Sequence, residues 1–386
     1  MDRQQPGDRH GLSRRGVAGT PMATPGKVGR PGPLGRREAG APTLKDVARA
    51  AGVSAMTASR VLRGLPGVSP AARDAVRQAV ETLGYRRNEL ARNLRLGRTS
   101  GLIGLVVTNL ANPFYSQMAL GVEAVAEEAG FRVVLTNTGE DAQRERRVVD
   151  ELVARRVDGM IVVPAGADHD HLSVRHLGRI PVVLAARPPS KISADCVLVD
   201  DFAGAREATI SLAATGARRI GFLGIPASAW TGSERYRGFC VALDEAGLVL
   251  DERYVRRNQR TVAAAEAAAL ELLGLEEPPE AVFCANNRNT IGAFRAVSRS
   301  GRTVRLAGFD DFELADMLGL PLIVVAYDPA DLGREAALLL LDRLNRGEQA
   351  APEAPRRVII PTHVVEYGQR VPGAVGVING SSPAKS

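Results

Sequence analysis

The pattern of hydrophobic and polar positions divides the 386-residue chain into regions of different structure. Residues 1–40 are rich in Gly, Pro and Arg and show no apolar periodicity, so we predict a disordered basic extension there. Residues 43–85 carry apolar residues at helical spacing in three short segments. After residue 101, short runs rich in Val, Leu and Ile alternate with helical stretches. This alternation predicts parallel βαβ units, and therefore an α/β domain with covered sheets.

The expected strands of the α/β region are short β-rich runs. They cover residues 102–107, 132–135, 160–163, 182–184, 220–223, 281–284 and 305–307. Helices are expected between them, for example over residues 117–128 and 143–155. Residues 371–386 are rich in Gly, Ser and Pro and are predicted to form a disordered tail without a leucine-heptad coiled coil.

The segment TLKDVARAAGVSAMTASRVLRG, residues 43–64, predicts two helices joined by a tight turn. Thr43 is placed to cap the first helix, with Asp46 in its first turn, and Ser54 is placed to cap the second. Gly52 supplies the positive φ that a tight helix–helix corner needs. A third helix is expected to start at Ser69-Pro70. Such a bundle is either a packing module or a DNA reader.

The outer face of the second predicted helix favours DNA binding. Arg60 is of the type that pairs bidentately with guanine in the major groove, and Ala55 or Met56 can contact a thymine methyl group. Ser54 and Thr57 are suited to phosphates. The outer face therefore carries the residue types of a recognition helix.

The charge distribution supports this interpretation. Residues 1–40 hold eight Lys/Arg against three Asp/Glu, and residues 41–100 hold eleven against four. The remaining residues carry a net charge of −5, although the whole chain is at +7. A basic N-terminal part and an acidic remainder indicate that the N-terminal part binds a polyanion. For residues 1–40 alone, a solvated basic tail is an equally good interpretation.

Composition disfavours several other classes of protein. No apolar run reaches membrane-spanning length and the start lacks a signal-peptide pattern, so the expected location is the cytoplasm, on the nucleoid. Cys196, Cys240 and Cys284 are widely spaced without CxxC pairing, which argues against a disulfide framework or a structural zinc site. The chain lacks a Walker A loop, a GxGxxG after a strand, a GxSxG and an HExxH, so we expect neither an enzyme nor a cofactor.

One loop contains residues that can bind metals. Residues 168–171, DHDH, with His176 follow an expected strand in a polar segment. A solvated loop is favoured over a metal site, because no supporting shell is apparent from the sequence.

Residues 43–64 and the following VSPAARDAVRQAVETLGYRRNELARNLRLGRTSGLIGLVV resemble the N-terminus of the LacI/GalR family of transcriptional repressors, and the resemblance runs from about residue 43 to 368. It implies an all-α, lambda-repressor-like helix-turn-helix followed by a periplasmic-binding-protein-like α/β core of two doubly wound parallel-sheet subdomains. It further implies that the second helix reads the major groove of double-stranded operator DNA. The implied base contacts are Ala55, Met56 and Arg60, and the implied phosphate contacts are Thr43, Ser54, Thr57 and Ser59. Arg63 stands where many members have Asn, and we expect its long cationic side chain to reach a phosphate.

The resemblance also gives a role to residues 88–95, NELARNLR, which are too short to form a stable helix alone. In the family, the equivalent segment orders on operator DNA, and two copies lie in the minor groove. Leu94 matches the leucine that wedges into the central base step, and Asn88 and Ala91 are implied neighbours. Spacing alone would favour an ordinary basic linker. Arg87 departs from the proline usual at that position.

The resemblance implies an effector-binding core over residues 101–370, preceded by a DNA-binding domain over 41–86 and a hinge and linker over 87–100. In the core, two α/β subdomains clamp a ligand and are joined by three crossings, expected near residues 200, 328 and 357. The expected N-subdomain covers about 101–200 and 328–356, and the expected C-subdomain about 201–327 and 357–370.

Polar and aromatic residues at the expected strand ends are the candidates for the cleft. Arg237 in ERYRGF is the strongest candidate for gripping a polar ligand, because its guanidinium carries five donors. The other candidates are Asn109, Asn112, Phe114, Asn286, Asp310 and Tyr327.

The cleft also departs from the family pattern. Ala186 and Asn287 stand where members commonly have Asp, Tyr327 replaces Gln, and Thr108-Asn109 replaces Pro-Asp. The loss of acidic groups weakens the case for a simple monosaccharide. It leaves open a less polar effector, an anionic effector or no effector.

These observations predict a sequence-specific DNA-binding regulator. We expect a repressor, because repression is the commoner behaviour in the family that it resembles. We expect a homodimer on a palindromic operator, controlled by a small-molecule effector, a sugar or related metabolite, in the core cleft, with no membrane partner. Two alternatives stay open. A solute-binding protein is permitted by the core fold, and an effector-independent regulator would have a degenerate cleft.

Overall fold

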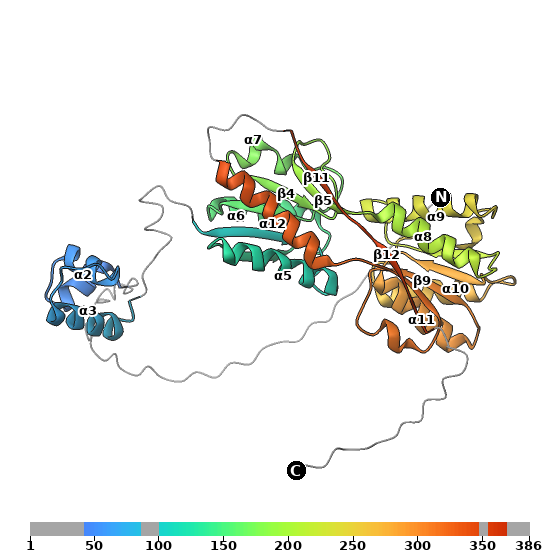
Figure 1. Cartoon of the computed structure of the whole chain (residues 1–386), viewed down its shortest axis with the longest axis horizontal. Coiled ribbons are helices and arrows are strands. Elements are labelled where there is room, and N and C mark those ends of the chain that lie inside the picture. Colours follow the sequence, from blue (N-terminus) through green and yellow to red (C-terminus); the bar gives the residue numbers. More distant parts are fainter. Residues whose placement is uncertain (1–41, 86–99, 347–353, 369–386) are drawn as a thin grey trace, which may run out of the picture. The chain divides into compact units, whose positions relative to one another are not determined.

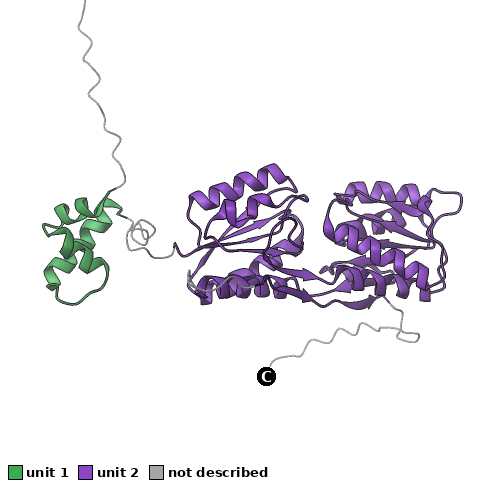
Figure 2. Ribbon diagram, turned by 90° about the horizontal axis from the view of Figure 1, so that it is seen from above, with its two compact units in different colours: residues 1–89 green, residues 90–386 purple. Residues whose placement is uncertain are grey.

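The computed structural model describes residues 42–85, 100–346 and 354–368. The chain divides into two compact units, residues 1–89 and residues 90–386 (Figure 2). Among the described residues, no helix is both long enough and apolar enough to cross a membrane.

The described part of the first unit is a bundle of three helices, α1 (Leu44–Ala50), α2 (Ala55–Leu62) and α3 (Pro70–Leu83). The three predicted caps are confirmed. Thr43 forms a reciprocal capping box with Asp46, Ser54 accepts a hydrogen bond from the Thr57 amide at 3.0 Å, and Ser69 accepts one from the Ala72 amide at 3.3 Å. These bonds satisfy amides that the first helical turn leaves without partners.

The corner between α1 and α2 is made by Gly52, whose φ of +64° suits a residue without a Cβ. The helices then pack their short apolar side chains together. The buried members of this small core are Val47, Ala48, Ala58, Val76 and Ala79. The core uses small residues, which allows the helices of so short a bundle to approach closely.

The N-subdomain of the second unit is built on a six-stranded parallel sheet with the order β11-β5-β4-β3-β1-β2 (Figure 1). Its strands are β1 (Leu102–Val107), β2 (Arg132–Asn137), β3 (Gly159–Val162), β4 (Val182–Ala185), β5 (Asp195–Val199) and β11 (Arg357–Ile360). Its helices are α5 (Pro113–Glu128), α6 (Ala142–Ala154), α7 (Val174–Leu177) and α12 (Pro329–Arg346), with a short 3-10 turn at Asp170–Leu172. Apolar side chains on both faces of the sheet are buried. Helices α5 and α12 cover one face, and α6 and α7 cover the other. Burial on both faces is the usual condition of a parallel sheet.

Helices α5 and α12 cross at a close approach that two glycines make possible. A Cβ at Gly121 of α5 would meet the Ala330 carbonyl, and a Cβ at Gly333 of α12 would meet the Met118 carbonyl. The two backbones therefore touch where each helix lacks a side chain.

The C-subdomain repeats the plan with the strand order β12-β10-β9-β8-β6-β7. Its strands are β6 (Ile220–Leu223), β7 (Val255–Arg256), β8 (Ala281–Cys284), β9 (Arg305–Phe309), β10 (Leu322–Ala326) and β12 (His363–Tyr367), of which β12 alone among the described strands of this sheet runs antiparallel. Its helices are α8 (Asp201–Ala214), α9 (Trp230–Glu245), α10 (Val262–Leu273) and α11 (Asn287–Ser300), with 3-10 turns at Glu252–Tyr254 and Ala315–Leu318. Helices α8 and α9 pack on one face of the sheet and α10 and α11 on the other.

The chain passes between the subdomains three times, after β5, after β10 and between β11 and β12 (Figure 1). The first two crossings lie near residues 200 and 328. The third differs from the expected position near 357, because residues 357–360 pair with β5 and belong to the N-subdomain. The passage occurs at 361–362, where Pro361 lacks the amide that a continuous strand would need.

Candidate ligand cleft and DNA-reading helix

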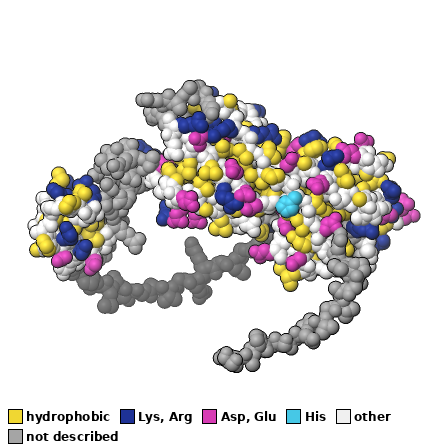
Figure 3. Space-filling view, viewed as in Figure 1, with side chains coloured by type: hydrophobic (Ala, Val, Ile, Leu, Met, Phe, Trp, Pro, Cys, Tyr) yellow, Lys and Arg dark blue, Asp and Glu magenta, His cyan; other side chains and the backbone are white. Residues whose placement is uncertain are grey.

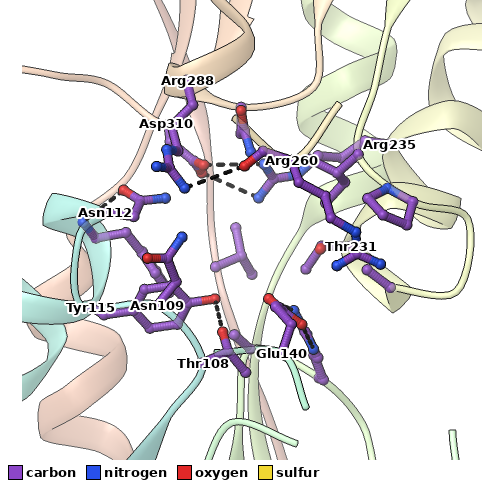
Figure 4. A pocket seen from close by; sticks show the side chains of 18 of the residues that line it. Thr108, Asn109, Asn112, Tyr115, Glu140, Thr231, Arg235, Arg260, Arg288 and Asp310 are labelled. Carbon is purple, nitrogen blue, oxygen red and sulfur yellow. Dashed lines mark hydrogen bonds and ion pairs between the residues drawn. The ribbon is translucent and has the colours of Figure 1, made fainter. Parts of the chain in front are cut away.

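A cavity of about 350 Å³ lies between the two subdomains (Figure 4). Most of its lining follows the carboxyl ends of strands. Thr108 follows β1, Arg187 follows β4, Asn286 follows β8, Asp310 follows β9 and Tyr327 follows β10. The carboxyl ends of parallel strands are where open α/β sheets bind ligands. The volume suits a small polar molecule.

Arg235 of α9 makes four hydrogen bonds on the C-subdomain side of the cleft. Its Nε donates to Asp201 at 2.7 Å, its Nη1 donates to the Ala285 carbonyl at 2.6 Å, and both Nη atoms lie 3.2 Å from Asp310. The guanidinium also stacks 3.6 Å above the centre of the Phe309 ring. Because buried charges are tolerated only when they are paired, this network fixes Arg235 in one orientation.

Two groups around Arg235 have pKa values displaced by burial. Burial raises the pKa of Asp201 to about 6, although Arg235 opposes the shift. Burial also raises the pKa of Tyr327 well above its ordinary value, so the phenol keeps its proton. Tyr327 therefore donates a hydrogen bond to Asp310, at 2.8 Å.

The N-subdomain side of the cleft contains a second buried ion pair. Arg187, with 7% of its surface exposed, holds both carboxylate oxygens of Glu140 at 2.9 and 3.0 Å and donates to the Pro164 carbonyl at 2.6 Å. Burial disfavours the charge of Glu140, yet Arg187 lowers the pKa of this carboxyl below its ordinary value. Beside this pair, Thr108 donates to the hydroxyl of Tyr115 at 2.7 Å.

One buried hydrogen bond joins the two subdomains across the cleft. The amide of Asn287, at the start of α11, donates to Asn112 Oδ1 at 3.0 Å, and the same oxygen caps α5 by accepting from the Phe114 amide at 3.2 Å. Both asparagines are buried. An aspartate at position 287 would set a carboxylate oxygen against Asn112 Oδ1, so this contact requires the amide of an asparagine.

Asn287→Ala is expected to increase amide hydrogen exchange about fivefold in residues 109–115 and 285–289, because the loss of about 1 kcal/mol favours opening of the cleft. Asn345→Ala, at an exposed position of α12, is the control and should leave the exchange rates unchanged. Equal exchange in both variants would show that the Asn112–Asn287 bond does not restrain the subdomains.

Six of the seven predicted cleft residues line the cavity: Asn109, Asn112, Phe114, Asn286, Asp310 and Tyr327. Arg237 does not. Its side chain is 56% exposed, pairs with Glu234 at 2.5 Å and stacks on the ring of Phe202 outside the cleft. Residues two apart on a helix are separated by about 200°, so Arg235 and Arg237 face opposite ways.

The face of α9 that meets the cleft carries Arg235. Thr231 also lines the cavity and lies four residues before Arg235, on the same face of α9. Other lining residues that the sequence analysis did not select are Tyr115, Glu140, Arg187, Arg260 and Arg288.

In the first unit, α2 presents an exposed face. Met56 is 70% exposed, and Ala55 is also exposed. Arg60 folds back on the turn that follows α2 and donates to the Pro66 carbonyl at 2.8 Å, and Arg63 donates to the Ser59 carbonyl at 3.2 Å. On the visible face of this unit, basic side chains are interspersed with hydrophobic ones (Figure 3).

The smaller polar residues of this unit are engaged in capping. The Thr43 hydroxyl donates to Asp46 at 2.6 Å, and the Ser54 and Thr57 hydroxyls lie 2.8 Å apart. The predicted hinge contacts Asn88, Ala91 and Leu94 lie outside the described residues.

The loop at residues 168–171 contains two histidines, and both are buried. His171 Nε2 lies 2.9 Å from Glu145, which is fully buried and accepts a hydrogen bond from the Ala165 amide at 2.5 Å. His169 accepts from the Ser190 amide at 3.1 Å. Across residues 42–85, 100–346 and 354–368, no three or more His, Cys, Asp or Glu gather as metal ligands would.

Comparison with known proteins identifies the class. Residues 43–88 match the family described as bacterial regulatory proteins, lacI family, and residues 100–370 match periplasmic binding proteins and sugar binding domain of LacI family. A helix-turn-helix followed by a periplasmic-binding-protein-like core defines a DNA-binding transcription regulator. The chain belongs to the lacI family of bacterial regulatory proteins, which confirms the predicted family and fold class.

Relatives match along most of the chain. The HTH-type transcriptional repressor CytR of Escherichia coli is 30% identical over 313 residues, which are 80% of this chain and 92% of CytR. The HTH-type transcriptional regulator CelR of Thermobifida fusca is 35% identical over 335 residues, 84% of this chain and 97% of CelR.

Two solved structures resemble the fold. The transcriptional regulator CelR–cellobiose complex has a TM-score of 0.63 at 33% identity and covers 85% of this chain and 99% of its own. The lac repressor dimer bound to operator and the anti-inducer ONPF has a TM-score of 0.70 at 25% identity. The match covers 84% of this chain and 97% of the lac repressor chain.

Proposed function

We propose that this regulator is a repressor that binds a palindromic operator as a homodimer in the cytoplasm, on the nucleoid, and that a small polyhydroxylated effector in the core cleft controls its affinity for DNA. The observation that carries the proposal is the combination, in one chain, of an exposed second helix and a polar cleft between two subdomains.

The DNA half of the proposal rests on α2. Ala55, Met56 and Arg60 contact base edges, where the two apolar side chains meet thymine methyl groups and the guanidinium meets guanine. Support comes from the exposure of Met56 and from the capped, well-packed helix beneath it. The proposed phosphate contacts are Thr43, Ser54, Thr57, Ser59 and Arg63. The resemblance adds Asn88, Ala91 and Leu94 in the minor groove.

The effector half rests on the cleft. Arg235 and Asp310 are held rigidly in place and keep unused hydrogen-bonding capacity toward the cavity, and Asn286 adds an amide. Donors and acceptors in fixed positions are suited to the hydroxyl groups of a sugar. A structure of CelR with cellobiose and one of the lac repressor with its operator agree with both halves.

Control of DNA binding follows from subdomain closure. An effector that contacts both sides of the cleft favours the closed arrangement, and it shifts DNA affinity only by its differential binding to the two arrangements. A coupling of about 1–3 kcal/mol, typical of allosteric proteins, changes operator affinity by about 5- to 150-fold.

Selection of random double-stranded DNA by the full-length protein tests the function. We expect enrichment of one palindromic sequence and a complex that contains two chains per site, measured by analytical ultracentrifugation. If no sequence is enriched, the repressor proposal fails and a solute-binding protein is favoured. If an operator is enriched but no metabolite fraction releases it, the protein is an effector-independent regulator.

A further inference from the structure

Two arginines in the cleft have no acidic partner in the described parts of the chain. Arg260 precedes α10 and Arg288 lies in the first turn of α11, and both line the cavity on the C-subdomain side (Figure 4). Arg288 Nη1 donates a hydrogen bond to the backbone carbonyl of Arg260 at 3.4 Å. This bond involves no carboxylate. Both guanidinium groups therefore lie beside the cavity without a bonded carboxylate among the described residues.

The other two lining arginines differ, since each is already paired. Arg187 holds Glu140, and Arg235 holds Asp310. Glu140 also feels the charge of Arg260, but both its oxygens are bonded to Arg187. The cavity is lined by four arginines and two carboxylates, and those two carboxylates are engaged by the paired arginines. The positive excess therefore belongs to Arg260 and Arg288.

The surroundings add to this positive potential. Arg288 is the second residue of α11, a 14-residue helix whose amino end, with its partial positive charge, lies at the cavity. The 16-residue α9, which begins at Trp230, also starts there, and its N-cap residue Ala229 provides no side-chain cap. Moreover, Ala186 in the lining and Asn287 at the start of α11 are uncharged, so neither adds a carboxylate to this side of the cavity.

We propose that the effector of this regulator is anionic: a polyhydroxylated molecule that carries a phosphate or a carboxylate, held by Arg260 and Arg288. Its hydroxyl groups meet Arg235, Asn286 and Asp310. The inference rests on the proposed function, in which the cleft binds the effector. A neutral sugar would leave two neighbouring positive charges without a counter-charge, whereas an anionic oxygen accepts charge-assisted hydrogen bonds from both.

Inorganic phosphate is a probe that needs no knowledge of the effector. At about ten times its Kd, and compared with chloride at equal ionic strength, phosphate is expected to raise the Tm of the full-length protein by about 2–4 °C. The double variant Arg260→Gln/Arg288→Gln should lose this increment. The variant Arg144→Gln/Arg302→Gln removes two exposed arginines outside the cleft and should keep it. No increment in the wild type, or an equal one in the cleft variant, overturns the inference.

Matched sugars distinguish the two kinds of anion. Calorimetric titrations of glucose, glucose 6-phosphate and gluconate are expected to give at least about tenfold tighter binding for one of the anions than for glucose. That preference should disappear in the cleft double variant and persist in the charge-matched control. Glucose binding as tightly as both anions contradicts the inference.

The outcomes separate this inference from the proposed function. Operator selection with the effector-free protein does not involve the cleft arginines. If phosphate binds through Arg260 and Arg288 while no operator is enriched, the anion site stands and the repressor proposal fails. If an operator is enriched but phosphate leaves the wild type unchanged, the regulator stands and the anionic effector is excluded.

Discussion

Arg235→Ala is expected to lower the core's free energy of unfolding by about 3–5 kcal/mol and to abolish effector binding. The substitution leaves Asp201 and Asp310 buried without their shared cation and removes the stacking on Phe309. It also takes away the one guanidinium N–H of Arg235 that these bonds leave available to a ligand. The free energy can be followed in urea through the fluorescence of Trp230, the chain's single tryptophan, which begins the same helix as Arg235.

Arg237→Ala provides the matched control on the same helix. Its ion pair with Glu234 is exposed, so its removal should change the free energy of unfolding by about 0.5 kcal/mol or less and leave effector binding intact. Similar losses in the two variants would refute the central role given to Arg235. Loss of effector binding in Arg237→Ala alone would restore the assignment made from the sequence.

Local features were predictable from the sequence because they depend on residues a few positions apart. The caps Thr43 and Ser54 and the corner at Gly52 each follow from residue types within one helical turn, and the structure contains all three. The strand expected over 102–107 is β1 at the same residues, because six consecutive apolar or small residues fit a buried parallel strand. The start of α5 was placed at residue 117, but Asn112 and Pro113 are a cap and a first-turn proline that mark an earlier start.

The organisation of the cleft was harder to predict from the sequence, because it depends on contacts between segments that are far apart in the chain. Arg187 and Glu140 are 47 residues apart, and Asn112 and Asn287 are 175 apart. Strand order decides which loops meet, and pairwise spacing carries no information about it. The choice between Arg235 and Arg237 also needed the structure, because helical periodicity shows that the two face opposite ways but not which face meets the cleft.

Arg60→Ala is expected to remove the preference for one base pair in each half of the operator, at a cost of about 1–3 kcal/mol per half-site. In the free protein, the guanidinium of Arg60 donates to the Pro66 carbonyl and lies at the exposed surface. Moving it to a guanine gives up one solvent-accessible hydrogen bond and forms two directed ones in the groove. The same substitution should leave the stability of the helical unit within about 0.5 kcal/mol of wild type, because the side chain is exposed.

Single-base variants of the selected operator provide the measurement for Arg60→Ala. At the position that Arg60 reads, the wild type should discriminate between bases and the variant should not, while both keep their preferences elsewhere. Arg73→Ala, an exposed arginine on α3, removes the same charge and serves as the control. It is expected to keep every base preference, even if it weakens binding uniformly and reduces the salt dependence. Unchanged discrimination in Arg60→Ala would mean that Arg60 contacts only the backbone, and base reading would then rest on Ala55 and Met56.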